Sequence, residues 1–200
     1  RTVKIGDQVW MAENLKVTKY RNGEAIPHIV DASAWANQSA GAWCAYDNND
    51  TYVATYGRLY NWYAVADPRG LAPAGWHIPS DAEWKQLEMF LGMSQSEADK
   101  LGERGSDQGG QLKESGTAHW YSPNAGATNT SGFTGLPGGH RYDYGHFGLI
   151  GDACGFWSST EYDTYYAWYR GLYYDVANVY RWYDGTNKHC GFSVRCVLDY

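Results

Sequence analysis

The chain has 200 residues, which is the length of one sizeable domain and short for two well-packed ones. Its 16 basic and 22 acidic side chains give a net charge of −6, which offers no long-range attraction to phosphate backbones or anionic membrane surfaces. No apolar run approaches the roughly 18 residues of a membrane span, and the polar first residues lack the apolar stretch of a signal peptide. We therefore expect a mature or trimmed single domain over residues 1–200, with no nucleic acid partner and no membrane insertion.

The first elements of the chain are predicted from the spacing of apolar residues. Residues 4–15 (KIGDQVWMAENL) begin with alternating apolar and polar side chains, which indicates an edge or first strand. Residues 59–67 (LYNWYAVAD) carry apolar side chains at helical spacing, which predicts a short amphipathic helix.

The clearest local signal is a capped helix over residues 78–92 (IPSDAEWKQLEMFLG). Ser80 and Glu83 have the spacing of a capping box, in which each side chain bonds to the backbone N–H of the other residue. Gly92 is expected to end the helix. Its buried stripe is predicted at Trp84, Leu87 and Leu91.

A second capped helix is predicted over residues 94–102 (SQSEADKLG). Ser94 is the expected N-cap and Glu97 occupies the third helical position. Ala98 and Leu101 are expected to face the core.

The composition changes after about residue 104, where glycine, serine, threonine and asparagine dominate. Short runs rich in aromatic and β-branched residues follow and are predicted strands. These runs are GFWSSTEY (155–162), YAWYRGLYY (166–174) and GFSVRCVL (191–198). Because helices precede strands instead of alternating with them, the predicted fold class is α+β, with helices on one side of an antiparallel sheet.

The cysteines, Cys44, Cys154, Cys190 and Cys196, include no CxxC pair of the kind used in zinc or thioredoxin chemistry. We favour disulfides, with four reduced and buried thiols as the alternative. On one strand Cys190 and Cys196 would lie about 20 Å apart at about 3.3 Å per residue, whereas a disulfide needs Cα atoms within about 7 Å. Two pairings remain. We favour Cys44 with Cys196 and Cys154 with Cys190, because the first bond closes a loop spanning most of the domain.

Six motifs follow one another along the chain and carry a resemblance to a known family. They are IGDQVWMAENL, YGRLYNWYAVAD, LAPAGWHIPSDAEW, SGFTGLPGGHR, FWSSTEY and GFSVRCV. In this order they resemble the Fibrobacter succinogenes major paralogous domain family over residues 3–199. The resemblance implies a C-type lectin-like fold of the formylglycine-generating-enzyme type, with two or three helices packed on a small antiparallel sheet and long irregular loops.

The same resemblance implies an extracytoplasmic location, at a cell surface or secreted, with a lipoprotein anchor in the full-length protein, as is typical of this family in Bacteroidetes. Cys44 and Cys196 stand where the family commonly has cysteine, which supports their pairing. Cys154 and Cys190 depart from the family pattern.

Catalytic and metal-binding patterns are missing from the sequence. Enzymes of the same fold oxidise a substrate cysteine with a close pair of thiols that bind copper, which requires two thiolates on one soft metal ion. Here the only pair close in sequence is Cys190 and Cys196, which a strand would hold apart. The six histidines include no HExxH motif and no i,i+4 pair. We therefore expect no enzyme activity and no cofactor.

One segment, DNNDTY (47–52), is similar to part of a calcium loop, because hard cations take several oxygen ligands. Its sixth position is Tyr52 instead of glycine, and its twelfth, Arg58, is not glutamate. We interpret the segment as a turn, with a structural calcium ion as the alternative.

The functional prediction rests on the tyrosine-rich segment 165–184 (YYAWYRGLYYDVANVYRWYD). If residues 165–174 form a strand, Trp168 and Leu172 share the face that is the better core candidate. The opposite face carries Tyr165, Tyr169 and Tyr173, interleaved with the small residues Ala167 and Gly171. Those rings are expected to be exposed or half exposed. Tyrosine supplies large rigid contact area with a polar tip, which is why interface hot spots and paratopes favour it.

We predict a non-enzymatic recognition domain that binds a protein or glycan ligand at a cell surface with the part of the chain at roughly 140–190. The expected ligand-binding residues are Tyr144, His146, Tyr162, Asp163, Tyr165, Tyr169, Tyr173, Asp175, Asn178, Tyr180, Trp182, Tyr183, Asp184 and Asn187. A glycan-binding module, with Trp182, Tyr183 or Tyr169 as the stacking plane, is one alternative. A structural adhesin or surface lipoprotein domain is another.

The resemblance carries a further implication for the same segment. Several domains of this fold are the variable proteins of diversity-generating retroelements, in which template adenines are randomised near the C-terminus. Randomised asparagine codons do not yield tryptophan or lysine. Under this hypothesis Trp168, Trp182 and Lys188 are fixed framework, while the tyrosines around them vary.

Overall fold

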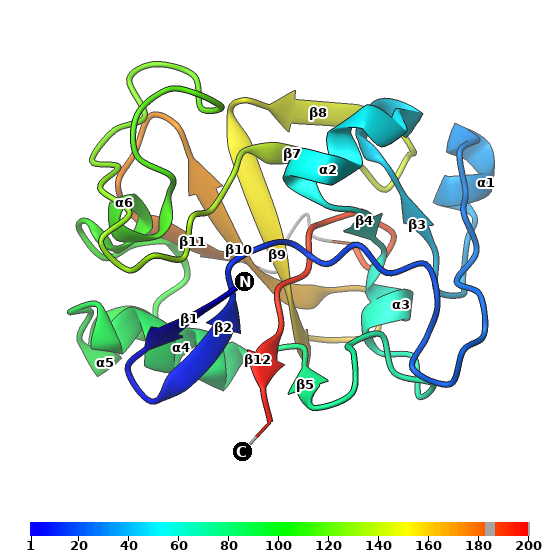
Figure 1. Cartoon of the computed structure of the whole chain (residues 1–200), viewed down its shortest axis with the longest axis horizontal. Helices are drawn as coiled ribbons and strands as arrows, with labels where there is room; N and C mark the ends of the chain where they lie inside the picture. Colours follow the sequence, from blue (N-terminus) through cyan, green and yellow to red (C-terminus); the bar gives the residue numbers. More distant parts are fainter. Residues whose placement is uncertain (183–186, 200) are drawn as a thin grey trace.

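In the computed structural model, which describes residues 1–182 and 187–199, the chain folds around a six-stranded sheet. Its strand order is β6-β11-β10-β9-β7-β8, and neighbouring strands are antiparallel except β7 and β9. The strands are β6 (Gly102–Arg104), β7 (Gly138–Arg141), β8 (Phe147–Ile150), β9 (Ala153–Glu161), β10 (Ala167–Tyr173) and β11 (Val179–Trp182). Figure 1 shows β9 crossing the middle of the molecule, with β10 and β11 on one side and the β7–β8 hairpin on the other.

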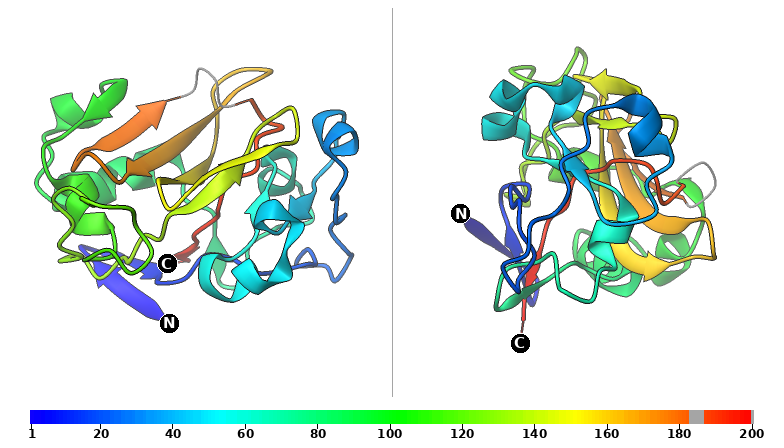
Figure 2. Two further views of the ribbon diagram at one scale, coloured as in Figure 1. Left: turned by 90° about the horizontal axis from the view of Figure 1, so that it is seen from above. Right: turned by 90° about the vertical axis from the view of Figure 1, so that its right-hand side faces the viewer.

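A four-stranded sheet brings together the beginning, middle and end of the chain, in the order β1-β2-β12-β5. Its strands are β1 (Thr2–Ile5), β2 (Gln8–Met11), β5 (Trp76–His77) and β12 (Val197–Leu198). The predicted first strand is confirmed and belongs to the β1–β2 hairpin, where Gly6 has the left-handed φ of 61° that favours glycine. The hairpin and β12 lie on the side of the molecule opposite β10 and β11 (Figure 2).

The remaining elements are a two-stranded ladder and short helices. The ladder pairs β3 (Trp43–Cys44) with β4 (Leu59–Tyr60). The helices are α1 (Ala32–Ala36), α2 (Val53–Tyr56), α3 (Trp62–Val65), α4 (Asp81–Phe90), α5 (Gln95–Ala98) and α6 (Gln108–Leu112), with 3-10 turns η1 (Tyr46–Asn48) and η2 (Asp50–Tyr52). The α+β class is therefore confirmed.

The predicted capping box is present at the start of α4. The Ser80 hydroxyl accepts from the Glu83 backbone N–H, and the Glu83 carboxylate accepts from the Ser80 backbone N–H. Trp84 and Leu87 are fully buried, as predicted, while Leu91 is half-buried. Because both halves of a capping box lie within one helical turn, the sequence alone determines it.

Two other helix predictions needed correction. The helix predicted over 59–67 begins only at Trp62, because the Asn61 side chain accepts from the Ala64 N–H and fixes the N-cap there, while Leu59 and Tyr60 pair with β3. In the second capped helix, Ser94 caps α5 as predicted. Leu101 is 44% exposed instead of facing the core, because α5 ends at Ala98 and Leu101 lies beyond it.

Helix α4 is fastened to the six-stranded sheet by buried ion pairs. The Glu88 carboxylate accepts from both terminal nitrogens of Arg104 at 2.7 Å and from Arg170 Nε at 2.6 Å. Asp81 pairs with Arg170 at 2.8 Å and with Arg181 at 2.7 Å. All of these side chains are buried, so the charges satisfy one another instead of water.

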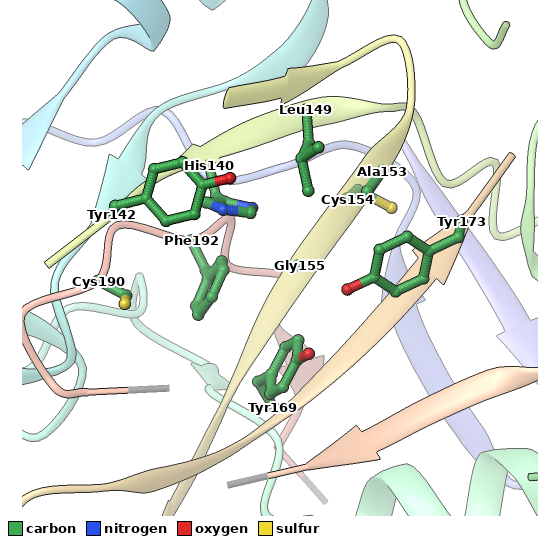
Figure 3. Close-up of a pocket in the computed structure, with 10 residues that line it drawn as sticks. All are labelled: His140, Tyr142, Leu149, Ala153, Cys154, Gly155, Tyr169, Tyr173, Cys190 and Phe192. Atoms are coloured by element: carbon green, nitrogen blue, oxygen red, sulfur yellow. The ribbon is translucent and has the colours of Figure 1, made fainter. Parts of the chain in front are cut away.

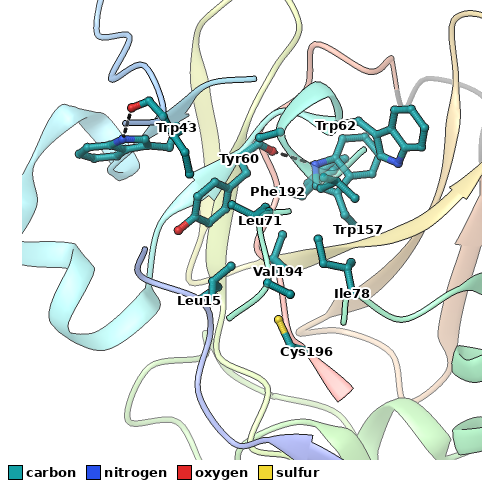
Figure 4. Packing of buried hydrophobic residues seen from close by; sticks show 14 of the residues in the cluster. Leu15, Trp43, Tyr60, Trp62, Leu71, Ile78, Trp157, Phe192, Val194 and Cys196 are labelled. Carbon is teal, nitrogen blue, oxygen red and sulfur yellow. Dashed lines mark hydrogen bonds between the residues drawn. The ribbon is translucent and has the colours of Figure 1, made fainter. Parts of the chain in front are cut away.

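A large hydrophobic cluster lies between β4, α3, β9 and the segment before β12 (Figure 4). Its centre includes Tyr60, Trp157, Phe192 and Val194, all nearly inaccessible to water. The Trp157 indole donates to the Tyr60 carbonyl at 2.8 Å, which satisfies the polar atom of this large buried ring.

Buried cations hold the long loops. Lys113 is fully buried and its Nζ donates to the carbonyls of Ala125, Tyr173 and Val176, each within 2.9 Å. Arg195, also buried, donates to the carbonyls of Phe133 and Thr134. Loop carbonyls that no strand partner reaches are satisfied in this way.

The predicted disulfides are absent, and this corrects the sequence-based pairing. All four cysteines are buried thiols. Cys44 packs with Trp35 and Leu59 in one cluster, whereas Cys196 belongs to the cluster around Phe192 and Val194. Cys154 and Cys190 likewise belong to different clusters, and Figure 3 shows them on different sides of one pocket.

Candidate functional site

The alternation of β10 divides its side chains between the two faces of the six-stranded sheet. Arg170 and Leu172 are buried on the face that α4 covers. Tyr169 and Tyr173 lie on the opposite face and are half-buried. The predicted alternation is therefore confirmed for this part of the strand. Ala167 departs from it, because the register shifts between Ala167 and Tyr169 and Ala167 is buried in the core.

Strand β11 extends the tyrosine-bearing face. Tyr180 pairs with Gly171 and Trp182 pairs with Tyr169. We call the surface formed by Tyr169, Gly171, Tyr173, Tyr180 and Trp182 the outer face. Its tyrosine rings contact one another: Tyr173 and Tyr180 have ring centroids 4.7 Å apart.

A pocket of about 250 Å³ opens between the outer face and the β7–β8 hairpin. Its lining consists of His140, Tyr142, Leu149, Ala153, Cys154, Gly155, Tyr169, Tyr173, Cys190 and Phe192 (Figure 3). Ala153 and Gly155 are neighbours on the same side of β9 and are small, so a hollow remains between the surrounding rings.

The position of Tyr169 depends on Phe192. The two rings are parallel, with centroids 5.1 Å apart, and Phe192 also packs edge-on against Trp157 and His140. A Cβ atom on Gly155 would lie 2.4 Å from Phe192 Cδ1, so only glycine allows this ring to approach β9 so closely. The sequence predicted an exposed or half-exposed ring for Tyr169. In the structure the Tyr169 ring is half-buried and packs flat against Phe192 at the edge of the pocket.

The described lining of the pocket contains no acidic side chain, lysine or arginine. Burial lowers the pKa of His140 to about 4, so that its ring is neutral at pH 7. Burial likewise raises the pKa of Cys154 and of Cys190 to about 12, and it raises the pKa of Tyr169 and Tyr173. The described lining therefore consists of neutral hydrogen-bonding groups and rings at pH 7, where thiolate is scarce.

The family of the chain follows from its sequence match. The family model of the Fibrobacter succinogenes major domain matches residues 3–198. The chain belongs to the Fibrobacter succinogenes major domain family. No curated protein and no solved structure matches it. The family expected from the six ordered motifs is thereby confirmed.

Of the predicted ligand-binding residues that the structure of this Fibrobacter succinogenes major domain describes, Tyr169 and Tyr173 line the pocket. Tyr180 and Trp182 lie beside it on the outer face. The Tyr180 hydroxyl donates to Glu103 at 3.1 Å, and the Trp182 ring packs over Gly102. These residues extend the surface around the pocket.

Two other groups of predicted residues lie on exposed turns. Tyr144 is 57% exposed and stacks on Tyr142, with ring centroids 5.1 Å apart, next to the exposed His146. Tyr162 and Tyr165 lie on the turn between β9 and β10 and are 43% and 68% exposed.

Two predicted polar residues have structural partners in this domain. Asp163 accepts from the backbone N–H groups of Tyr165 and Tyr166, which shapes the turn between β9 and β10. Asn187 Oδ1 accepts from the His189 backbone N–H.

The last predicted residues are Asp175, Asn178, Tyr183 and Asp184. Asp175 is exposed and Asn178 is half-buried between β10 and β11. Tyr183 and Asp184 lie outside the described residues.

Sequence reasoning missed most of the pocket. His140, Tyr142 and Leu149 come from the β7–β8 hairpin, and Phe192 comes from the segment before β12. His140 and Tyr142 are two positions apart, a spacing that places two side chains on the same face of a strand, so the sequence could have predicted that they lie together. The contribution of Phe192 was not readable, because it depends on how distant segments meet.

The described residues contain no group of three or more histidine, cysteine or acidic side chains that could hold a metal ion. In the same part of the chain, no helix is long and apolar enough to cross a membrane. The segment 47–52 forms turns η1 and η2.

Proposed function

We propose that this chain is a non-enzymatic ligand-recognition domain that binds its ligand on the outer face, with one group of the ligand entering the tyrosine-lined pocket. The observation that carries this proposal is the arrangement of Tyr142, Tyr169 and Tyr173 around a floor of small residues. Concave sites lined by aromatic side chains with a few polar atoms are the usual form of a binding site.

The chemistry of the pocket favours an uncharged ligand group. An ionised group would lose its hydration there without meeting an opposite charge, because the described lining carries none. A neutral ring would pack against Tyr169 and Tyr173 and still find phenol and imidazole partners for a polar edge. An aromatic side chain of a protein ligand has this chemistry.

The scaffold behind the outer face supports a binding role, because rigid sites lose less entropy when a ligand binds. Arg170 follows Tyr169 on β10 and points to the opposite face of the sheet, where its guanidinium donates hydrogen bonds to Asp81 and Glu88. Lys113 binds the Tyr173 carbonyl directly. The backbone that presents both tyrosines is therefore anchored from the buried side.

The proposal includes a C-type lectin-like fold and an extracytoplasmic, cell-surface location with a lipoprotein anchor in the full-length protein. Membership of the Fibrobacter succinogenes major domain family supports both. Long loops also fit this fold, since residues 113–137 contain no helix or strand.

We include in the proposal that the tyrosines of the outer face are diversified by a retroelement. Its support is that the expected framework residues have structural roles. Lys188 is buried, pairs with Glu161 and donates to the carbonyls of Asp163 and Thr164. Trp168 lies under the Arg181 guanidinium, 3.8 Å from its ring centroid.

Sequencing of many alleles of this gene tests the diversification. Substitutions are expected at Tyr169, Tyr173 and Tyr180, with Trp168, Trp182 and Lys188 constant. Alleles that vary at Lys188 while the tyrosines remain constant would contradict it.

Site-specific photo-crosslinking tests the binding proposal. A benzoylphenylalanine at Tyr173, in the protein expressed in its own cell envelope, is expected to give one discrete adduct. Benzoylphenylalanine at Tyr121, an exposed tyrosine outside the pocket lining, is the matched control and is expected to give none. Adding Ala153→Leu, which fills the pocket floor, is expected to abolish the adduct. An adduct that persists with the pocket filled, or no adduct at Tyr173, would refute the proposal.

A further inference from the structure

A second pocket lies on the other side of the β7–β8 hairpin from the tyrosine-lined pocket. The hairpin separates the two: His140 and Leu149 line the tyrosine-lined pocket, whereas Arg141, Phe147 and Ile150 line the second. Leu149 has a left-handed φ of 63°, which interrupts the alternation of β8 and lets Phe147 and Ile150 border the same pocket. The second pocket is larger, at about 550 Å³.

Aromatic rings form one wall of this second pocket. Tyr46 packs edge-on against Tyr52, with ring centroids 5.6 Å apart. It also packs against Phe147 in a tilted arrangement, with ring centroids 5.4 Å apart. Tyr46 and Tyr52 come from turns η1 and η2 and are half-buried, so their rings have both a fixed position and an accessible surface. Rings arranged in this way offer apolar faces to a ligand at low entropic cost.

Polar side chains with unused hydrogen-bonding capacity also border this pocket, and we call them its polar rim. In the described part of the chain, the exposed Asp47 carboxylate makes no hydrogen bond or ion pair. Asn48 donates its Nδ2 to the Val30 carbonyl at 3.1 Å, which fixes the amide and leaves Oδ1 as an acceptor. His146 is exposed at the same rim.

The backbone at this rim is strained. Asp47 and Asn48 have φ values of 52° and 53°, so two consecutive residues other than glycine adopt the left-handed conformation. Asp and Asn tolerate this conformation better than most residues, but glycine has no steric cost there. Two glycines would form the same turn without this steric cost. The Asp47 and Asn48 side chains are therefore present at a cost in stability.

The charge of the second pocket disfavours an anionic ligand. Arg141 lies behind its wall, fully buried, over the Phe147 ring. Each of its guanidinium nitrogens already donates to a backbone carbonyl, those of Gly145, Ile29 and Val30. An anion in the pocket would therefore meet the exposed Asp47 carboxylate, whereas the fully buried Arg141 guanidinium is not accessible for direct contact with it.

We propose that this second pocket binds an uncharged saccharide, with sugar faces against Tyr46 and Tyr52 and hydroxyl groups bonded to Asp47 and Asn48. Sugar hydroxyls both donate and accept, which matches a carboxylate, an amide oxygen and an imidazole. A volume of about 550 Å³ lies within the range of small-molecule sites. The site is separate from the outer face, including Tyr169 and Trp182, two of the residues predicted for glycan stacking, apart from the shared hairpin.

Saturation-transfer NMR on the purified domain tests the proposal with methyl glycosides of glucose, galactose, mannose and N-acetylglucosamine. Glucose 6-phosphate and glucuronic acid are the charged comparators. At least one neutral glycoside is expected to bind, at least tenfold more tightly than either charged comparator. Binding of none of the neutral sugars, or equal binding of the charged ones, would overturn the proposal.

The variant Asp47→Gly removes the carboxylate at a position where glycine fits the backbone best. It is expected to weaken sugar binding at least tenfold and to leave the melting temperature unchanged or raised, which separates loss of a ligand contact from loss of the fold. Asp50→Asn, on the same loop but outside the lining, is the matched control and should bind sugar normally. Unchanged binding by Asp47→Gly would overturn the proposal. Ala153→Leu is expected to leave sugar binding intact, so this test and the crosslinking test fail independently.

Discussion

Tyr169 lies flat against Phe192, with ring centroids 5.1 Å apart and ring planes inclined by only 7°. One ring comes from β10 and the other from the segment that leads to β12. Their contact closes one edge of the pocket, and it exists because Gly155 on β9 lets the Phe192 ring lie almost on the backbone.

The variant Gly155→Ala is expected to destabilise the domain by about 1–3 kcal/mol, because the added methyl group would overlap Phe192. That ring cannot move aside easily, since Trp157, Tyr169 and His140 surround it. Urea unfolding measures the loss. The double variant Gly155→Ala/Phe192→Leu should recover part of it, and strictly additive effects would show that the two residues are not coupled.

Within the buried ion network, Glu88 is fully buried and forms ion pairs with both Arg104 and Arg170. Its substitution is therefore expected to destabilise the fold strongly. Removing its charge with Glu88→Gln leaves buried arginines undercompensated and is expected to cost about 3–5 kcal/mol of unfolding free energy. The control is Asp99→Asn, whose carboxylate is exposed and pairs with Lys85. That change should cost much less unfolding free energy than Glu88→Gln in the same experiment, because solvent screens an exposed ion pair. Equal effects of the two substitutions would contradict the role given to burial.

The sequence was sufficient for features whose causes are local. The Ser80–Glu83 capping box and the alternation of Tyr169 and Arg170 depend on residues within a few positions of each other, and both are present. The ion pair between Glu88 and Arg170 joins positions 82 residues apart. No periodicity indicates such a pair, because it arises only when α4 packs on β10.

The residues of the site divide in the same way, into those that a local pattern predicts and those that depend on contacts between distant segments. Tyr169 and Tyr173 were predicted from the pattern of one strand, and both line the pocket. His140 and Phe192 were not predicted, because β7 lies beside β9 in a parallel arrangement and Phe192 reaches the sheet from the end of the chain. The disulfide prediction failed for a related reason. The number and the sequence spacing of the cysteines do not determine which of them are close in space. In the structure the two members of each predicted pair belong to different hydrophobic clusters.

All four cysteines are therefore expected to behave as inaccessible thiols. Burial raises the pKa of Cys44 and of Cys196 to about 12, as it does for the two thiols of the pocket, so thiolate is scarce at neutral pH. Iodoacetamide should modify the native protein slowly and the urea-unfolded protein at four positions, as read by mass spectrometry. Dithiothreitol should leave the melting temperature unchanged. A lower melting temperature in reductant would show that a disulfide stabilises the domain after all.

His140 is expected to make the domain less stable in mild acid. Burial lowers the pKa of the folded-state imidazole from 6.5 to about 4, so between these values the unfolded chain binds a proton that the folded chain does not. Stability therefore rises with pH across this window, and it is lost as the pH falls, by at most about 3 kcal/mol. His140→Gln removes the titrating group and should flatten the difference in unfolding free energy between pH 7 and pH 5. His146→Gln, which alters an exposed histidine of the same hairpin, should keep the wild-type slope. If both variants retain that slope, protonation of His140 does not determine the acid sensitivity of the fold.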